Sequence, residues 1–180
     1  MKKTKYVPSG GLAFSEEKDM MTLQAYAKEG WILYKFSLLG YRLKKGESRD
    51  IQYSVDYKKN ADEDYYSYFE AAGWSHVCSA GNEIHIFSAP IGTKPIYSDK
   101  ETVIEKYERQ QKQMGKVALP SLIVFIIFFA LSIMGKYDWV YGSVRIVSSV
   151  LSIITIVVIV FSGMPYISYT YKLKKMRKNK

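Results

Sequence analysis

The chain has 180 residues and a formal net charge of +9, with 26 Lys and Arg against 17 Asp and Glu. The excess is confined to one end: residues 1–115 carry 17 basic and 16 acidic side chains, whereas residues 116–180 carry 9 and 1. Because the first part is close to neutral, we exclude nucleic acid as a partner. The single cysteine, Cys78, excludes an intramolecular disulfide and fits a reducing compartment.

The first predicted helix covers residues 15–30. Apolar residues recur at helical spacing, Ser15 is suited to an N-cap before an acidic first turn, and Gly30 is suited to a left-handed C-cap. Aromatic and β-branched residues then predict strands over residues 31–37, 40–44 and 51–57.

The same pattern returns in the next stretch of chain. A second helix is predicted over residues 62–72, and it again ends in a glycine followed by tryptophan. Two further strands are predicted over residues 74–79 and 83–88. We expect Gly30 and Gly73 to end the two helices, and Trp31 and Trp74 to fill the gap between layers of the core. Stacking of the tryptophans on a ligand is the alternative.

A helix followed by strands, repeated twice, favours an α+β fold. Residues 5–14 supply a possible leading strand. We predict a two-layer, ferredoxin-like domain, in which a duplicated αββ unit forms an antiparallel sheet with helices on one face. A two-helix transmembrane hairpin follows it.

Two apolar runs, Val117 to Met134 and Ile146 to Met164, contain no charged residue. Each approaches the roughly 20 residues that a helix needs to cross about 30 Å of hydrocarbon. A soluble fold of this size could not cover two such helices. The predicted parts are a cytosolic domain (1–91), a linker and juxtamembrane amphipathic helix (92–116), two spans (117–134 and 146–166) joined by an extracellular loop (135–145), and a basic cytoplasmic tail (167–180).

Aromatic and basic residues predict where this hairpin meets the membrane surface. Aromatic residues of the loop suit a headgroup boundary, and the basic residues after the second span suit anionic lipid on the cytoplasmic side. These interface residues are Tyr137, Trp139, Tyr141, Lys172, Lys174, Lys175, Arg177 and Lys178. The positive-inside rule then places both termini in the cytoplasm, and the N-terminus lacks the apolar segment of a signal peptide.

One candidate metal site lies in the last predicted hairpin. If Gly81 and Asn82 form a two-residue turn, Cys78 pairs with His85, and His76 shares their face. Glu83 could add a fourth ligand for zinc or copper(I). The alternative is a pair of polar histidines on a half-exposed hairpin, and a one-residue change of register would separate the ligands.

No catalytic motif is present in the sequence. The chain has no phosphate-binding glycine loop, nucleophile elbow or zinc-protease helix. The acidic run at residues 62–64 opens the second helix, where carboxylates favour the helix dipole. We therefore expect neither enzymatic activity nor a cofactor.

The chain resembles the bacterial family catalogued as domain of unknown function 2812, over roughly residues 12–110. The resemblance depends on Ala27-Lys-Glu-Gly-Trp31, Phe69-Glu-Ala-Ala-Gly-Trp74 and the Tyr53-Ser-Val-Asp-Tyr57 segment between them. It implies a membrane-attached cytosolic domain without assigned activity, in some members encoded near PadR-like regulators. It transfers no functional residue.

These features together predict a membrane-anchored, non-catalytic cytosolic domain that modulates a membrane or regulatory protein partner. The bilayer with anionic headgroups is itself an expected partner, and the hairpin could support a homo-oligomer. The alternative is a small-molecule or metal sensor that signals through the juxtamembrane helix. That helix could also be only a spacer.

Overall fold

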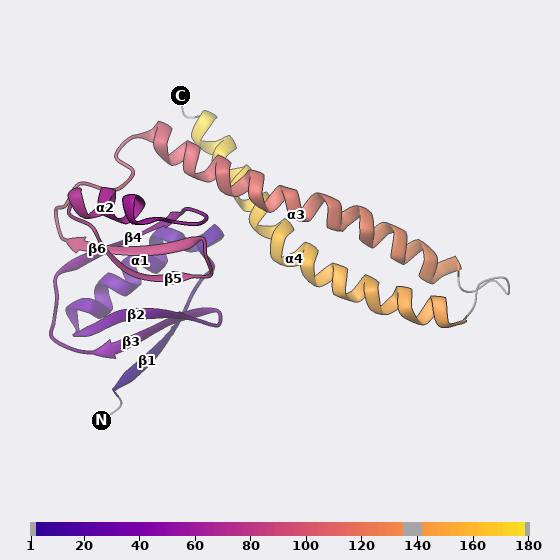
Figure 1. Ribbon diagram of the computed structural model, residues 1–180, viewed down its shortest axis with the longest axis horizontal. Helices are drawn as coiled ribbons and strands as arrows, with labels where there is room; N and C mark the ends of the chain where they lie inside the picture. The colour runs from indigo at the N-terminus through magenta and orange to yellow at the C-terminus, as the bar shows by residue number, and fades with distance from the viewer. Residues whose placement is uncertain (1–2, 135–141, 179–180) are drawn as a thin grey trace. The chain divides into compact units, whose positions relative to one another are not determined.

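The computed structural model describes residues 3–134 and 142–178 as two compact units, Met1–Lys106 and Tyr107–Lys180. The elements, labelled in Figure 1, are β1 (Thr4–Pro8), α1 (Leu12–Lys28), β2 (Trp31–Ser37), β3 (Gly40–Lys45), β4 (Ile51–Tyr57), α2 (Glu63–Ala71), β5 (Ser75–Ala80), β6 (Ile84–Pro90), α3 (Lys100–Met134) and α4 (Gly142–Lys178). The first unit extends past the expected boundary at residue 91, because the segment after β6 and the first turns of α3 pack within it.

The predicted α+β class and the antiparallel pairing are confirmed. The repeated unit is longer than predicted: a strand precedes each helix, so each copy is β-α-β-β. Each copy forms its own three-stranded sheet, with strand orders β1-β3-β2 and β4-β6-β5. Two sheets replace the single sheet expected, because the first strand of each copy pairs with the last strand of the same copy.

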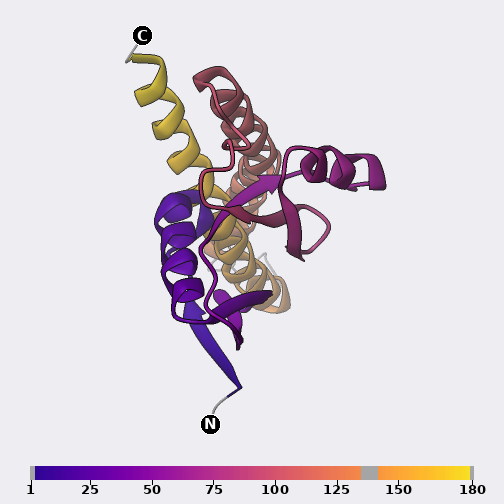
Figure 2. The ribbon, with the colours of Figure 1, turned by 90° about the vertical axis from the view of Figure 1, so that its left-hand side faces the viewer.

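The two helices use different faces of the second sheet. Alternate residues of β4 point to opposite faces, and Tyr53, Val55 and Tyr57 join the main core with Leu23 of α1. The other face of this sheet packs on α2, through Phe87 and a smaller cluster. Figure 2 shows α1 and α2 on opposite sides of these strands. The structure thus differs from the expected arrangement with both helices on one face.

Both helix-ending glycines have the backbone conformation that the sequence predicts. Gly30 has φ 78° and Gly73 has φ 83°. The tryptophans that follow them differ in burial. Trp74 is 2% exposed and its indole N–H donates to the Lys94 carbonyl at 3.0 Å, whereas Trp31 is half-buried at the edge of the main core. Trp74 therefore has the predicted core role, and Trp31 has it only in part.

The second unit contains an antiparallel pair of helices. The predicted juxtamembrane helix and first span form one helix, since α3 continues through Gly115 and Pro120. α4 extends beyond the second apolar run to Lys178. Gly115 allows α3 and α4 to pack closely, since a Cβ there would lie 3.0 Å from the Tyr166 ring. Small hydroxyl residues of α4 are buried, and Ser149 hydrogen-bonds to Ser132 of α3 at 2.7 Å.

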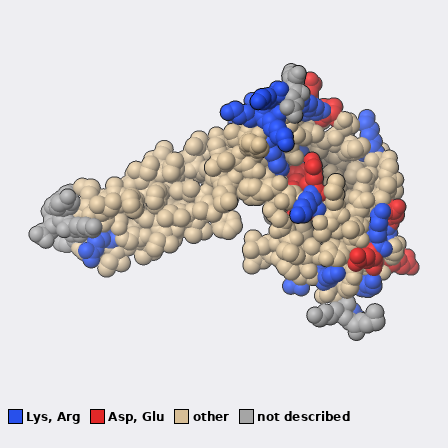
Figure 3. Space-filling view, turned by 180° about the vertical axis from the view of Figure 1, so that it is seen from behind, with Lys and Arg blue, Asp and Glu red and all other residues tan. Residues whose placement is uncertain are grey.

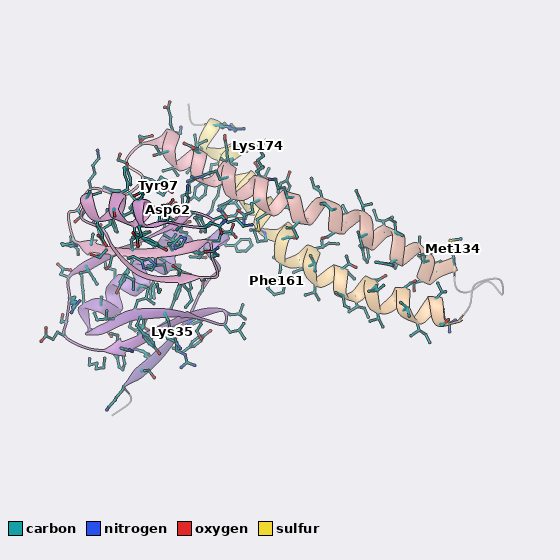
Figure 4. The ribbon with its side chains drawn as sticks, viewed as in Figure 1. Lys35, Asp62, Tyr97, Met134, Phe161 and Lys174 are labelled. Atoms are coloured by element: carbon teal, nitrogen blue, oxygen red, sulfur yellow. The ribbon has the colours of Figure 1, made fainter. Side chains whose placement is uncertain are left out.

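Both helices of this pair are long and apolar enough to cross a membrane, judged by length and composition. Only 6% and 17% of their most apolar 18-residue windows are buried, so neither resembles the core helix of a soluble protein. Figure 3 shows little charge along the pair, with Lys and Arg at its ends. In Figure 4, Phe161 marks the apolar part of α4, and Lys174 marks the end away from the loop.

We predict that Gly30→Ala destabilises the chain more than Gly92→Ala. Both glycines have positive φ, at 78° and 91°, which costs an alanine about 1 kcal/mol. A Cβ at Gly30 would also lie 2.7 Å from the Gly46 carbonyl oxygen, whereas one at Gly92 meets nothing within 4 Å. Thermal unfolding of the full chain in detergent, followed by tryptophan fluorescence, should show a loss of at least about 2 kcal/mol for Gly30→Ala. Equal losses would contradict the proposed clash.

Candidate functional site

A buried ion pair lies where α3 begins. The ammonium group of Lys106 donates to Glu16 Oε1 at 2.5 Å and to the Val55 carbonyl at 2.8 Å. The side chains of Lys106 and Glu16 are 4% and 10% exposed. Burying a charge without its partner is costly, so this pair strongly favours one placement of the first turns of α3 against α1 and β4.

Aromatic residues enclose this ion pair. The Tyr57 hydroxyl donates to Glu16 Oε2 at 3.1 Å, which engages the second carboxylate oxygen. The Lys106 ammonium also lies 5.3 Å from the ring centroid of Tyr57 and 4.7 Å from that of Tyr97. These distances are within the range of cation–π attraction. The ammonium is thus held by a carboxylate, a carbonyl and two ring faces.

The same network continues to α2 through a second buried carboxylate. Asp56 of β4 accepts hydrogen bonds from Tyr65 of α2 at 2.9 Å and from Tyr97, which lies between β6 and α3 (Figure 4). Burial raises the pKa of Tyr65, and the nearby Asp56 carboxylate raises it further. Tyr65 therefore stays protonated and keeps its donor role. The Lys106 network, defined as Glu16, Asp56, Tyr57, Tyr65, Tyr97 and Lys106, connects α1, β4, α2 and α3.

A histidine cluster lies on the same side of the second sheet as α2. Since the Lys58 carbonyl can only accept, His85 donates through Nε2–H at 2.9 Å. Nδ1 lies 2.8 Å from the hydroxyl of Ser79 and 3.2 Å from that of Tyr66, and a ring protonated at Nε2 alone accepts from one of them. His76 Nε2 lies 2.9 Å from the same Ser79 hydroxyl, and the two imidazole centroids are 6.0 Å apart.

The predicted pairing of Cys78 with His85 is wrong. A bulge between His76 and Cys78 shifts the register, so that Cys78 pairs with Ile86 and Ser79 pairs with His85. His76 pairs with Phe87, which is the pair that the predicted two-residue turn also requires. The turn contains three residues, because Ala80 pairs with Ile84 and not with Glu83. The single extra residue places Cys78 on the face opposite the histidines.

Cys78 is consequently a core residue and not a metal ligand beside the histidines. Its thiol packs with the main core, and burial raises its pKa to about 12, so it stays protonated at neutral pH. Within residues 3–134 and 142–178, no group of three or more His, Cys, Asp and Glu side chains could hold a metal ion. His76 and His85 remain together as a hydrogen-bonded pair.

The carboxylates of the Lys106 network were not identified from the sequence. The acids at 16, 17 and 19 suggested favourable charges in a first helical turn, but α1 starts at Leu12 and has a kink at Ser15 in place of the expected N-cap. Glu16 is buried against Lys106, and Asp19 accepts from Gly10 N–H and from the Tyr41 hydroxyl. The acidic run at 62–64 does have its expected role, since Asp62 caps α2 by accepting from the Tyr65 N–H.

The predicted membrane-interface residues of the tail lie on α4. Lys172 sits 5.0 Å and 5.9 Å from the ring centroids of Tyr107 and Tyr169, and Arg177 forms an ion pair with Glu108. Arg177 is exposed, as are Lys174, Lys175 and Lys178. The predicted loop residues Tyr137, Trp139 and Tyr141 lie outside the described residues.

Comparison with known families shows which family the chain belongs to. The family model described as "Protein of unknown function (DUF2812)" matches residues 15–119, more than half of the sequence. The chain belongs to this family. No curated protein and no solved structure gives a significant match. The matched DUF2812 segment includes Glu16, Asp56 and Lys106, so the complete Lys106 network falls within it.

We predict that Lys106→Met destabilises the protein by about 3–5 kcal/mol, because it leaves the Glu16 carboxylate buried without its partner. Lys28→Met is the matched control. It breaks the Lys28–Asp50 pair, whose side chains are 54% and 67% exposed, and should cost less than about 1 kcal/mol. The free energy of unfolding of the full chain in detergent, measured for wild type and for each variant, gives both losses.

The double variant Glu16→Gln/Lys106→Met tests whether the unpaired carboxylate causes the loss of stability. It removes both charges, so it should recover part of the stability that Lys106→Met loses. A loss for Lys106→Met no larger than that of the control would contradict the importance of the buried pair.

We also predict a pH dependence that comes from His76. Burial, followed by the proximity of His85, lowers the pKa of His76 below its ordinary value of 6.5. The unfolded chain therefore binds a proton more readily than the folded chain, and stability is lost as pH falls below about 6.5. The midpoint of thermal unfolding should fall more between pH 7 and 5 for wild type than for His76→Gln. Because His76 is partly exposed, the difference should be less than about 1 kcal/mol, and identical profiles would contradict it.

Proposed function

We propose that this DUF2812 protein is a non-catalytic regulatory domain, anchored to the cytoplasmic face of a membrane by the α3–α4 hairpin, that modulates a membrane or regulatory protein partner. The observation that carries the proposal is the burial of Lys106 beside Glu16. Through this contact, the helix that contains the first candidate span starts as a packed part of the globular unit. A change at that unit can therefore act on the span.

Charge supports the proposed orientation. Six Lys and Arg lie within residues 171–180, whereas the segment between the two apolar runs carries Lys136 and Arg145 against Asp138. An excess of basic residues marks the cytoplasmic ends of spans. The globular unit precedes the first span, so in this orientation it lies in the cytosol together with both termini.

An exposed apolar turn, called here the tip, supports binding to a protein partner. Leu38 and Leu39, at the turn between β2 and β3, are 86% and 70% exposed. Leu39 adopts a φ of 55°, which is uncommon for leucine. The Tyr6 hydroxyl lies 3.0 and 3.1 Å from the two leucine carbonyl oxygens and shares its single proton between them, and the Ser9 N–H donates to the Leu39 carbonyl. A turn that is held in this conformation with two leucines in solvent suits contact with another protein.

A small-molecule sensor is the alternative function. The Lys106 network favours it too, because a ligand that altered the contacts of Asp56 or Glu16 would act on α3 by the same route. Copurification of a stoichiometric small molecule with the full chain would favour the sensor. Copurification of a specific membrane or regulatory protein would favour the proposed function.

The test places a photo-reactive amino acid at residue 38 of the full chain in the native cell, with residue 21 as control. Met21 is also apolar and 69% exposed, but it lies on α1. We expect position 38 to crosslink to one membrane or regulatory protein, and position 21 not to. Leu38→Ser/Leu39→Asn should lower copurification of that protein at least about tenfold, because two leucines lose their burial while Asn tolerates the positive φ.

Met21→Ser should leave copurification unchanged. The absence of a specific crosslink at position 38, or equal losses for the two variants, would contradict a role of the tip in partner binding.

A further inference from the structure

A groove of about 720 Å³ lies between α3 and α4 in the second unit. Its lining residues include Lys112, Lys116 and Arg177, which are basic, and Leu119 and Pro120, which are apolar. Tyr166 completes the wall on the α4 side. The groove is therefore amphipathic, and its two lysines and two apolar residues follow one another along α3.

The order of these residues matches the layers of a membrane surface. Lys112 and Lys116 precede the charge-free run that starts at Val117, and Leu119 and Pro120 lie within that run. With a rise of about 1.5 Å per residue, Lys112 and Leu119 are about 10 Å apart along the helix. A molecule that fills the groove would thus meet cations at one end and hydrocarbon contacts at the other.

The groove is built by defined contacts between its two helices. Gly115 lacks a side chain, and a Cβ there would lie 3.0 Å from Tyr166, so the helices approach closely at this level. On the basic side, Gln111 donates to the Thr170 hydroxyl at 2.8 Å, and Arg177 pairs with Glu108. Glu108 also lines the groove and is paired with Arg177. Among the described lining residues, Lys112 and Lys116 are then the exposed cations that can meet an anion there.

We propose that this groove binds one anionic glycerophospholipid, with its phosphate at Lys112 and Lys116 and an acyl chain along Leu119 and Pro120. The assignment rests on the proposed membrane anchorage, which places these lysines at headgroup depth. Two ammonium groups suit a phosphate, and the apolar half of the groove suits an acyl chain but not a free phosphate ion. The lipid would contact α3 and α4 together.

The experiment uses the full chain, reconstituted in equimolar phosphatidylglycerol and phosphatidylcholine, extracted in mild detergent and examined by native mass spectrometry. Wild type should retain one phosphatidylglycerol in preference to phosphatidylcholine. Lys112→Gln/Lys116→Gln should lower that preference on the order of 30-fold. Lys174→Gln/Lys175→Gln is the matched control: it removes the same charge from exposed positions of α4 that do not line the groove, and should keep the preference.

Three results would overturn the lipid site. Equal losses in the two double variants would show general attraction of basic residues to anionic lipid, and no preference in wild type would show that the groove selects no lipid. Displacement of phosphatidylglycerol by millimolar inorganic phosphate would assign the lysines to a soluble anion. If the chain stays in vesicles after alkaline carbonate extraction, the proposed membrane anchorage stands, whichever of these three results is obtained. Release of wild type by carbonate would overturn the anchorage and the lipid site together.

Discussion

The contact between Lys106 and Glu16 is the constraint on which the organisation of this protein depends. A lysine and a glutamate 90 positions apart in the sequence are both removed from water, and neither charge is tolerable there without the other. The pair therefore determines where α3 starts on the globular unit. Tyr57, Tyr97 and Asp56 extend this constraint to β4, to the segment before α3 and, through Tyr65, to α2. The result is a helix that begins as part of a folded core and continues as a candidate membrane span.

The β-α-β-β unit occurs twice in the domain that holds this contact. The two copies differ in how their helix packs, and this difference explains why the Lys106 network forms on one side. Both β-α-β-β copies form a sheet with the same strand order, and both end their helix with a glycine of positive φ. The helix of the first copy packs into the main core, whereas α2 packs on the outer face of the second sheet. Only the first copy therefore supplies a helix whose carboxylate can meet Lys106.

The second unit shows a different balance of forces. Only 6% and 17% of its apolar windows are buried, so its helices do not depend on a protein core of their own. Contacts between them are made by hydroxyl groups, a glycine and aromatic rings, which allow close approach of helices in an apolar environment. Among the described residues, the ion pair of Arg177 with Glu108 and the contact of Lys172 with Tyr107 lie at the end that carries the basic residues. In the proposed function this end lies at the cytoplasmic surface, where protein and lipid charges meet.

The elements, their types, the α+β class and the two apolar helices could be predicted from the sequence, because hydrophobic period and glycine position are local properties of the chain. The sequence did not determine strand register: one bulged residue moved Cys78 to the opposite face of the sheet and separated it from His85. Nor did it indicate that Glu16 would be buried, since an acid near the start of a helix is equally suited to solvent. Pairing across 90 residues depends on which faces pack together, and no local pattern in the sequence shows this.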